Sequence, residues 1–436
     1  MRPALLLLTA SACFAQPAPN PDDVLSRARI RLAEAAAAVP KYTCTETVDR
    51  SYFRETRQAP QSCDNIIANR RAGRVKLVLA ATDRLRFDVE VADGGYEIYA
   101  WPGASRIANE KIEDMAGGGP LGTGPFGPFL VDIFSNSAVQ FQYLGEKSGL
   151  FEYRYRVPLK ASHYHVQSGL TWRFTPYDGA FLLDPASAEL KQLNVRTAEL
   201  PSITGSCEAT TLMDFESLRI GAGKYLIPRQ THLQVVGRDA NFTENAVSYT
   251  NCHEFHAESE VRFDEPAPQP RSGLTLSSSP HGPTLPPGLP IILLLDTEID
   301  TDRAAAGDPV TAEIAKTIID PKTHQVLIEA GTVVRGRITH LEHKIEGEQY
   351  FLIGLSFDPL PIVLDEPRQI ADPRAAGIQL KKDGYQQGDI ERRSAAISTE
   401  SRSSLRGAGL LIFATHESKY IVPRGYLSNW ITLPNK

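Results

Sequence analysis

A proline-rich stretch from Asp264 to Pro290 divides the chain, and it constrains the fold more than any other part of the sequence. It reads DEPAPQPRSGLTLSSSPHGPTLPPGLP, in which no apolar repeat with a period of 2 or 3.6 residues survives. Such a segment cannot bury enough apolar surface to offset the entropy lost on ordering, so we expect an extended, semi-rigid linker. The predicted organisation is a first domain over 20–264, a linker over 265–290 and a smaller domain over 291–436.

Length and charge narrow the classes of function. The 436 residues are enough for two buried cores, and the formal net charge is −6. Because the chain has no basic stripe to neutralise phosphates, it offers no electrostatic reason to bind nucleic acid. It carries neither a P-loop nor a dinucleotide-binding fingerprint, and no cofactor is expected.

Residues 1–15 have the composition of a secretory signal peptide. One arginine precedes a short leucine-rich run, and small residues lead up to Ala15. The preferred interpretation is cleavage after Ala15. The alternative treats Ala10 to Cys13 as a lipobox, with Cys13 lipidated and the protein anchored to a membrane. Either way we expect a periplasmic or secreted protein whose mature chain has no transmembrane span.

Four cysteines remain after residue 15, namely Cys44, Cys63, Cys207 and Cys252. An even number in an exported chain predicts two disulfides, although four cysteines allow three pairings. We predict Cys44–Cys63 and Cys207–Cys252, because each of these bridges closes a local loop. No Cys-x-x-Cys spacing points to a redox site or a zinc knuckle.

The first domain is predicted to begin with a helix from Pro21 to Val39. Asn20 is a good N-cap, apolar residues recur on one face, and Pro40 ends the helix. From residue 41 to about 264 apolar and polar residues alternate instead, as they do from Leu85 to Val91. The predicted fold class is mainly β, with a large curved antiparallel sheet (a half-barrel) and an N-terminal helix.

The second domain shows short strand patterns separated by turns, and it is predicted to be a small β-barrel. Residues 365–406 lose all periodicity and hold mixed charges, so they are predicted to form a mobile insertion.

No combination of residues predicts a catalytic centre. His163 and His165 stand two apart on an expected strand and would share one face, as in some zinc sites, but no third ligand can be assigned. Exposed histidines near a strand end are the alternative, and no metal site is predicted. The glycine-rich stretch from Met115 to Pro128 lacks the Lys-Ser/Thr pair of a P-loop and is interpreted as a flexible surface loop.

Aromatic residues gather around this glycine-rich stretch. One interpretation is that they fill the core between the sheet and the helix, and the other is that they line an apolar cavity for a lipid or a peptide. The residues predicted to line such a cavity are Leu32, Tyr96, Tyr99, Trp101, Phe126, Phe129, Phe134, Phe141 and Tyr143.

The first domain resembles lipoprotein carriers of the LolA type and the related RseB sensor domain. The shared pattern is a signal peptide, one amphipathic helix and a long antiparallel run with Asp93-Gly94-Gly95-Tyr96 as a strand-entry turn. The stretches Lys41 to Cys44, Tyr96 to Gly103 and Glu258 to Phe263 also resemble uncharacterised exported bacterial proteins. The resemblance to the carriers implies a curved half-barrel that holds acyl chains against covering helices.

The second domain resembles the small barrels of TrbI-type envelope channel proteins, through Ala306 to Val310 and Ala330 to Ile338. No transmembrane anchor precedes this domain, so a role in channel assembly is not implied.

The leading functional hypothesis is an exported, non-catalytic envelope protein that binds an apolar ligand (a lipid or lipoprotein) or a protein partner of the envelope. The alternative is a structural or assembly factor of an envelope complex, without a ligand cavity. An exported hydrolase is the third hypothesis.

Overall fold

The computed structural model describes residues 19–38, 41–56, 61–91, 97–104, 112–121, 128–168, 171–197, 200–221, 223–254, 285–358, 362–364 and 409–432. The predicted signal peptide, Cys13, the linker up to residue 284 and the insertion 365–406 lie outside these residues. So do Tyr96 and Phe126, and the side chains of Phe129 and His165 are not described either.

Within the described residues, the first unit contains four α-helices, two short 3-10 helices and most of the long strands. The helices are α1 (Pro21–Ala38), α2 (Cys63–Arg71), α3 (Ile112–Met115), α4 (Pro128–Ser135), η2 (Leu159–Ala161) and η3 (Ser202–Thr204). The strands are β1 (Tyr42–Glu55), β2 (Leu77–Val91), β3 (Glu97–Ala100), β4 (Gln140–Lys147), β5 (Leu150–Val157), β6 (His165–Ser168), β7 (Thr171–Phe174), β8 (Tyr177–Leu183), β9 (Leu190–Thr197), β10 (Ser206–Ile220), β11 (Gly223–Gly237) and β12 (Phe242–Glu254).

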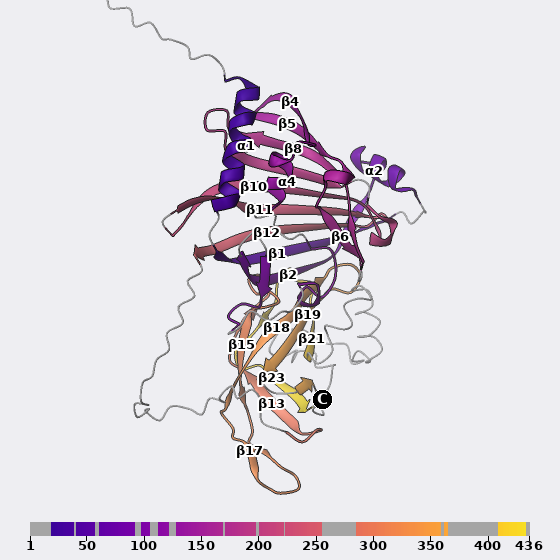
Figure 1. Cartoon of the computed structure of the whole chain (residues 1–436). Coiled ribbons are helices and arrows are strands. Elements are labelled where there is room, and N and C mark those ends of the chain that lie inside the picture. The colour runs from indigo at the N-terminus through magenta and orange to yellow at the C-terminus, as the bar shows by residue number, and fades with distance from the viewer. Residues whose placement is uncertain are drawn as a thin grey trace, which may run out of the picture.

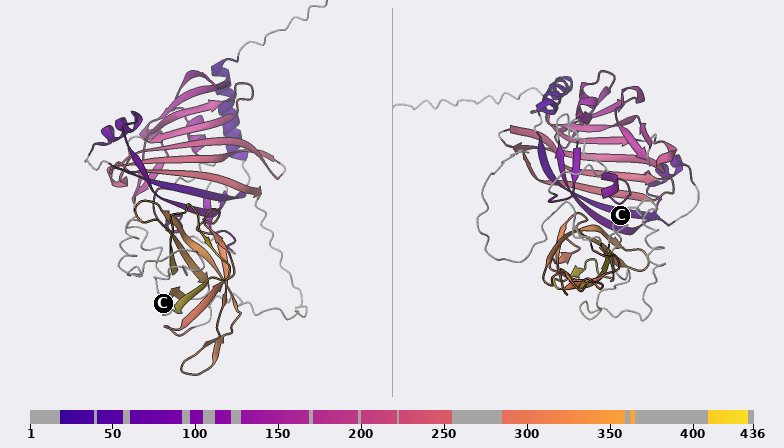
Figure 2. Two further views of the ribbon diagram at one scale, coloured as in Figure 1. Left: turned by 180° about the vertical axis from the view of Figure 1, so that it is seen from behind. Right: turned by 60° about the horizontal axis from the view of Figure 1, so that its bottom comes forward.

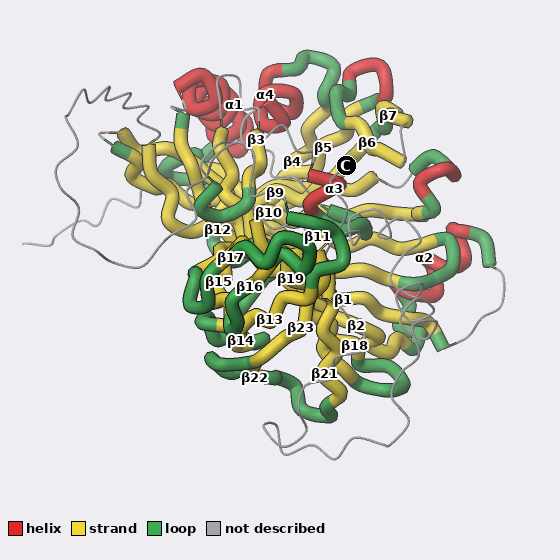
Figure 3. The backbone as a smooth tube through the Cα atoms, turned by 90° about the horizontal axis from the view of Figure 1, so that it is seen from below, coloured by secondary structure: helices red, strands yellow, loops and turns green. Residues whose placement is uncertain are grey.

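These strands form one large antiparallel sheet in the order β4-β5-β8-β9-β10-β11-β12-β1-β2-β3 (Figure 1). Most neighbours in this order also follow one another along the chain, whereas β1 inserts between β12 and β2 although β12 lies about 200 residues further along the chain. The sheet curves without closing, and α1 and α4 lie together on one of its faces, while α2 lies apart at the other end of the strands (Figure 3). The predicted fold class, mainly β with a large antiparallel sheet and an N-terminal helix, is confirmed.

The second unit rolls shorter strands around its own core (Figure 2). The strands are β13 (Pro290–Leu295), β14 (Ile299–Asp300), β15 (Pro309–Ile314), β16 (Ile318–Ile319), β17 (Val326–Ile328), β18 (Val333–Lys344), β19 (Tyr350–Asp358), β20 (Ile362–Leu364), β21 (Gly409–Ala414), β22 (Ile421–Val422) and β23 (Leu427–Thr432). The main pairings run β20-β23-β13-β15-β18-β19-β21. Trp430 and Phe413 are buried at the centre, and Leu285 and Leu289, from the end of the expected linker, are part of this core.

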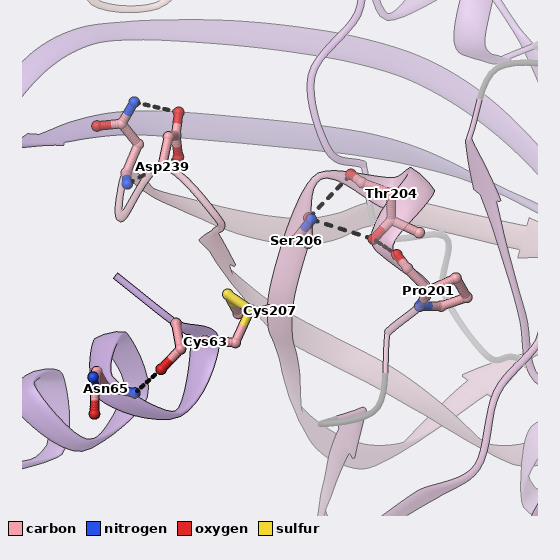
Figure 4. The surroundings of a disulfide bond; sticks show 9 residues. Cys63, Asn65, Pro201, Thr204, Ser206, Cys207 and Asp239 are labelled. Atoms are coloured by element: carbon pink, nitrogen blue, oxygen red, sulfur yellow. Dashed lines mark hydrogen bonds between the residues drawn. A yellow bond between two sulfur atoms is a disulfide. The ribbon is translucent and has the colours of Figure 1, made fainter. Parts of the chain in front are cut away.

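Both disulfides are present, but the predicted pairing is wrong. Cys44 is bonded to Cys252 across 208 residues of chain. Cys63 is bonded to Cys207 across 144 residues, and Figure 4 shows this second bridge. Cys44 and Cys252 lie on the neighbouring strands β1 and β12, where a bulge interrupts the register, and their Cα atoms are 4.1 Å apart. Cys63 begins α2, which this bridge ties to the first residues of β10. The local-loop argument failed because the order of the strands brings distant cysteines together.

Candidate functional site: the inner face of the large sheet

The register of the strands assigns one continuous set of side chains to the face that α1 and α4 cover. In the antiparallel pairings Tyr143 stands opposite Tyr153, Tyr153 opposite Phe181, and Phe181 opposite Leu193. The same face continues through Met213, Thr231, Val247 and Val48 to Leu85, since directly opposed residues point to the same side of a sheet. We call this surface the inner face, and it has an aromatic half and a polar half.

The aromatic half lies on β4, β5 and β8 beneath α1 and α4. The ring of Phe181 is 4.9 Å from that of Phe134, 5.2 Å from that of Tyr153 and 5.9 Å from that of Phe141, measured between ring centroids. Phe134 and Phe181 are fully buried. Burial, more than any neighbouring charge, raises the pKa of Tyr153 to about 12, so its hydroxyl stays protonated at neutral pH.

Helix α1 covers these rings through a narrow apolar stripe and is fixed by polar contacts at its rim. Its stripe consists of Val24, Ala28 and Leu32, at the four-residue spacing of one helix face. The guanidinium of Arg27 donates to the carbonyl oxygens of Pro185 and Ala186 at 2.9 and 3.1 Å, and Arg31 donates to Ser187. Further bonds join Arg29 Nε to Phe134 O (2.6 Å) and Tyr153 Oη to Pro21 O (2.8 Å). The cover is thus a separate element held by a few side-chain hydrogen bonds.

The polar half is organised by Arg50 on β1. Its guanidinium makes two 2.7 Å bonds to the carboxylate of Asp83, and both residues are almost fully buried. It also donates to the carbonyl oxygens of Gly118 (2.6 Å) and Ala116 (2.9 Å). Asn245, directly opposite Arg50 on β12, donates to Pro120 O at 2.7 Å.

These contacts correct the prediction of a flexible surface loop for the described part of the glycine-rich stretch, 115–121. Met115 and Ala116 are buried. Side chains of the sheet donate to the carbonyl oxygens of every second residue of the segment, namely Ala116, Gly118 and Pro120. Gly117, Gly118 and Gly119 have φ angles of 66°, 92° and 81°, a left-handed conformation that glycine adopts without strain. The glycines therefore shape a segment that crosses the inner face; we call residues 115–121 the glycine strap.

Glu46 lies on the same side of β1 as Arg50 and is completely buried. No hydrogen-bond donor among the described residues reaches either of its carboxylate oxygens. It stands opposite Tyr249 on β12 and Phe87 on β2. Burial raises the pKa of Glu46 well above its usual range, and the nearby Glu97 raises it further. The fold therefore favours the protonated, neutral form of this carboxyl group.

The two units meet along β2. Strand β18 pairs with β2 so that Glu342 stands opposite Asp83 and Lys344 opposite Ala81. Arg86 binds both carboxylate oxygens of Asp308 at 2.5 and 2.6 Å, and its backbone N–H donates to Ala306 O at 2.8 Å. The pairing of β2 with β18 joins the strands of both units into one sheet, which has 17 strands among the described residues.

Trp101 belongs to this junction. Its ring lies 5.6 Å from that of Phe87, and the guanidinium of Arg337, from the second unit, lies 5.7 Å from its ring centroid. A Cβ atom at Gly307 would approach Trp101 to 2.9 Å and would clash with the carbonyl oxygen of Arg86, so only glycine fits there.

The predicted cavity residues thus fall into separate groups. Leu32, Phe134 and Phe141 belong to the aromatic half, and Tyr143 lies at its margin with 38% of its surface exposed. Tyr99 and Trp101 belong to a second cluster around Phe87, and Tyr99 donates to Glu97 Oε2 at 2.6 Å. The lining of a cavity by these residues stays a prediction. The sequence analysis did not identify Glu46 and Arg50. The alternation of buried and half-buried residues along β1 places both on the buried side of the strand, and this pattern could have indicated them.

His163 lies in the turn before β6, not on the strand itself, and its Nδ1 is 2.9 Å from Asp132 Oδ1 of α4. The side chain is 73% exposed. Within the described residues no group of three or more His, Cys, Asp or Glu side chains is arranged to hold a metal ion. Likewise, none of the helices described here is both long and apolar enough to cross a membrane.

Comparison with known proteins found one similar solved structure and no matching family model or curated protein. Among solved structures the chain is similar to a crystal structure described as a "putative outer membrane lipoprotein-sorting protein domain" from Vibrio parahaemolyticus. The identity is 12%, the match covers 56% of this chain and 96% of that one, and the TM-score is 0.24. No functional argument rests on this match, and the resemblance of the second unit to TrbI-type barrels stays a prediction.

Proposed function

We propose that this protein is an extracytoplasmic, non-catalytic binding protein that holds an apolar chain of a lipid or lipoprotein against the inner face, beneath α1 and α4. The observation that carries the proposal is the construction of the cover. Helix α1 buries Val24, Ala28 and Leu32 against the aromatic floor, with Leu25 partly buried beside them, and its outer attachments are arginine bonds to backbone carbonyls. The two disulfides fit an oxidising compartment outside the cytoplasm.

Energetics support displacement of α1 by such a ligand. Burying an alkyl chain contributes about 0.8 kcal/mol per methylene, so ten buried methylenes contribute about 8 kcal/mol. A typical protein hydrogen bond contributes about 1 kcal/mol net, and charged donors such as Arg27 and Arg31 about 1.5–3 kcal/mol. A chain of ordinary fatty-acid length therefore offsets the loss of these hydrogen bonds, and its methylenes replace the apolar contacts that Val24, Ala28 and Leu32 make with the aromatic floor.

The test is the uptake of a fluorescent fatty acid by the wild type and by two tryptophan variants of α1. Leu32→Trp enlarges a buried side chain that faces the aromatic floor, and we expect at least a tenfold loss of uptake with an unchanged circular dichroism spectrum. Ile30→Trp is the matched control, because Ile30 lies on the same helix with 61% of its surface exposed and should bind the probe like the wild type. Equal loss in both variants, or no uptake by the wild type, contradicts the proposal.

The structural or assembly factor without a ligand cavity is supported by a different observation. The rings of Phe134, Phe141 and Phe181 contact one another directly, at 4.9 to 6.1 Å between centroids. Strand β4 pairs only with β5 among the described residues and leaves Tyr143 and Leu144 exposed, so its outer edge could receive a strand from an envelope protein. Mass spectrometry of the purified protein separates the two functions, since co-purified lipids are expected only for the binding protein.

A further inference from the structure

Glu46 is a buried polar group whose presence the fold does not explain. A core-facing position of β1 between Cys44 and Val48 would be filled by an apolar residue at no cost. Instead it holds a carboxyl group with 0% exposure and no hydrogen-bond donor from the described residues. Leaving such a group without a partner costs about 1–3 kcal/mol or more, so it is retained against a stability penalty.

The surroundings of Glu46 have the character of a cation-binding site. A second carboxyl group, Glu97 on β3, is close enough to raise the pKa of Glu46 by its charge. Tyr99 and Tyr249 flank it, and both feel its charge in turn. Arg50, the next charged residue on this face of β1, is already bound to Asp83 and to the glycine strap. Two carboxyl groups beside aromatic rings complement a positively charged group, which carboxylates pair with and aromatic rings attract.

We propose that Glu46, with Glu97, Tyr99 and Tyr249, binds the amine group of a cationic amphiphile whose alkyl chain lies along the inner face. The proposal deepens the proposed function and rests on it for the position of the alkyl chain. The register places Glu46 on the same continuous face as Val247, Thr231 and Met213, which lead across the sheet to the aromatic half. A ligand with an amine at one end and an alkyl chain at the other thus matches both halves.

The glycine strap provides a route to the site. Met115 and Ala116 pack in the same cluster as Tyr99 and Tyr249. Arg50 and Asn245 hold the strap through hydrogen bonds to its backbone carbonyl groups. The three glycines at positive φ give this part of the chain more conformational freedom than any other residue type would. The strap therefore covers the part of the inner face next to Glu46, and moving it breaks no strand pairing.

Binding of an amine should release a proton, because burial favours the protonated form of the carboxyl group whereas pairing with the cation favours the ionised form. Titration calorimetry of the full chain with dodecylamine, in buffers of different ionisation enthalpy at pH 7, measures this release. We expect the wild type to bind dodecylamine at least tenfold more tightly than 1-dodecanol, with proton release. Glu46→Gln, which keeps the shape of the side chain, should bind both probes equally and release no proton. Glu90→Gln, on the opposite side of β2, is the control and should behave as the wild type.

The outcomes distinguish a failure of the proposed amine site at Glu46 from a failure of the proposed function. Equal binding of both probes by the wild type, or an amine preference that survives in Glu46→Gln, overturns the site while leaving the proposed function standing. If neither alkyl probe binds, the proposed function fails, and the site is then judged with ethylammonium, which has no long chain. Ethylammonium should raise the melting temperature of the wild type but not that of Glu46→Gln, and an equal effect on both overturns the site.

Discussion

At the scale of single residues, the inner face carries two buried ionisable groups, of which one has hydrogen-bond partners and the other has none among the described residues. Arg50 is buried with four hydrogen bonds, two to the carboxylate of Asp83 and two to backbone carbonyl groups. Glu46, four residues earlier on the same side of β1, is buried with none among the described residues. A satisfied buried charge organises its surroundings, whereas an unsatisfied carboxyl group is kept neutral and available. The contrast separates the structural role of Arg50 from the binding role that we propose for Glu46.

The raised pKa of Glu46 predicts how stability depends on pH. A carboxyl group whose pKa is higher in the folded than in the unfolded state destabilises the fold as pH rises from the unfolded value, about 4.3, toward the folded value. Relative to Glu46→Gln, the wild type should therefore lose up to about 1.4 kcal/mol of unfolding free energy per pH unit across that window. Urea unfolding of both proteins between pH 4 and 8 measures the difference. A constant difference over this range would show that the carboxyl group is not perturbed.

At the scale of elements, the disulfides tie together parts of the sheet that are far apart in sequence. Cys44–Cys252 joins the first and last long strands of the unit, and Cys63–Cys207 joins α2 to β10. A bridge that closes a long loop restricts the unfolded chain strongly, so each should contribute about 2–5 kcal/mol.

Digestion without reduction, followed by mass spectrometry, should identify linked peptides for Cys44–Cys252 and Cys63–Cys207. The double variant Cys44→Ala/Cys252→Ala should retain its fold while losing about 2–5 kcal/mol of unfolding free energy. Recovery of a Cys44–Cys63 peptide from the native protein would contradict the strand order, because β1 lies between β12 and β2.

At the scale of the whole molecule, the two units are joined by direct contacts between their described residues as well as by the chain that runs from one to the other. The pairing of β2 with β18 and the ion pair between Arg86 and Asp308 cross the junction. Arg54 adds a second ion pair, with Glu346. Neither disulfide crosses it, since all four cysteines belong to the first unit. The units should therefore stay associated when the chain between them is cut.

Limited proteolysis within 265–284, followed by gel filtration, tests this association. The two fragments of the wild type should elute together. Arg86→Glu places two negative charges at the junction and should separate them, whereas Arg86→Glu with Asp308→Arg restores opposite charges and should restore co-elution. Separate elution of the wild-type fragments would mean that β2 and β18 do not hold the units together.

The sequence by itself determined the local structure of this protein. The alternation of apolar and polar residues predicted the strands of the first unit, and the N-cap and apolar face predicted α1, because both patterns reflect which side of a single element is buried. The even number of cysteines predicted that all four are bridged. The same alternation places Glu46 and Arg50 on the buried side of β1, so the polar half of the inner face was also open to prediction.

Only the tertiary structure decided which elements meet. The insertion of β1 between β12 and β2 pairs Cys44 with Cys252, brings Asn245 opposite Arg50 and spreads the aromatic residues over two clusters. The pairing of β2 with β18 likewise places Trp101 at a junction between units. A strand pattern specifies a buried side but not its neighbour, since many partners offer similar backbone hydrogen bonds and the choice among them depends on packing summed over the whole sheet.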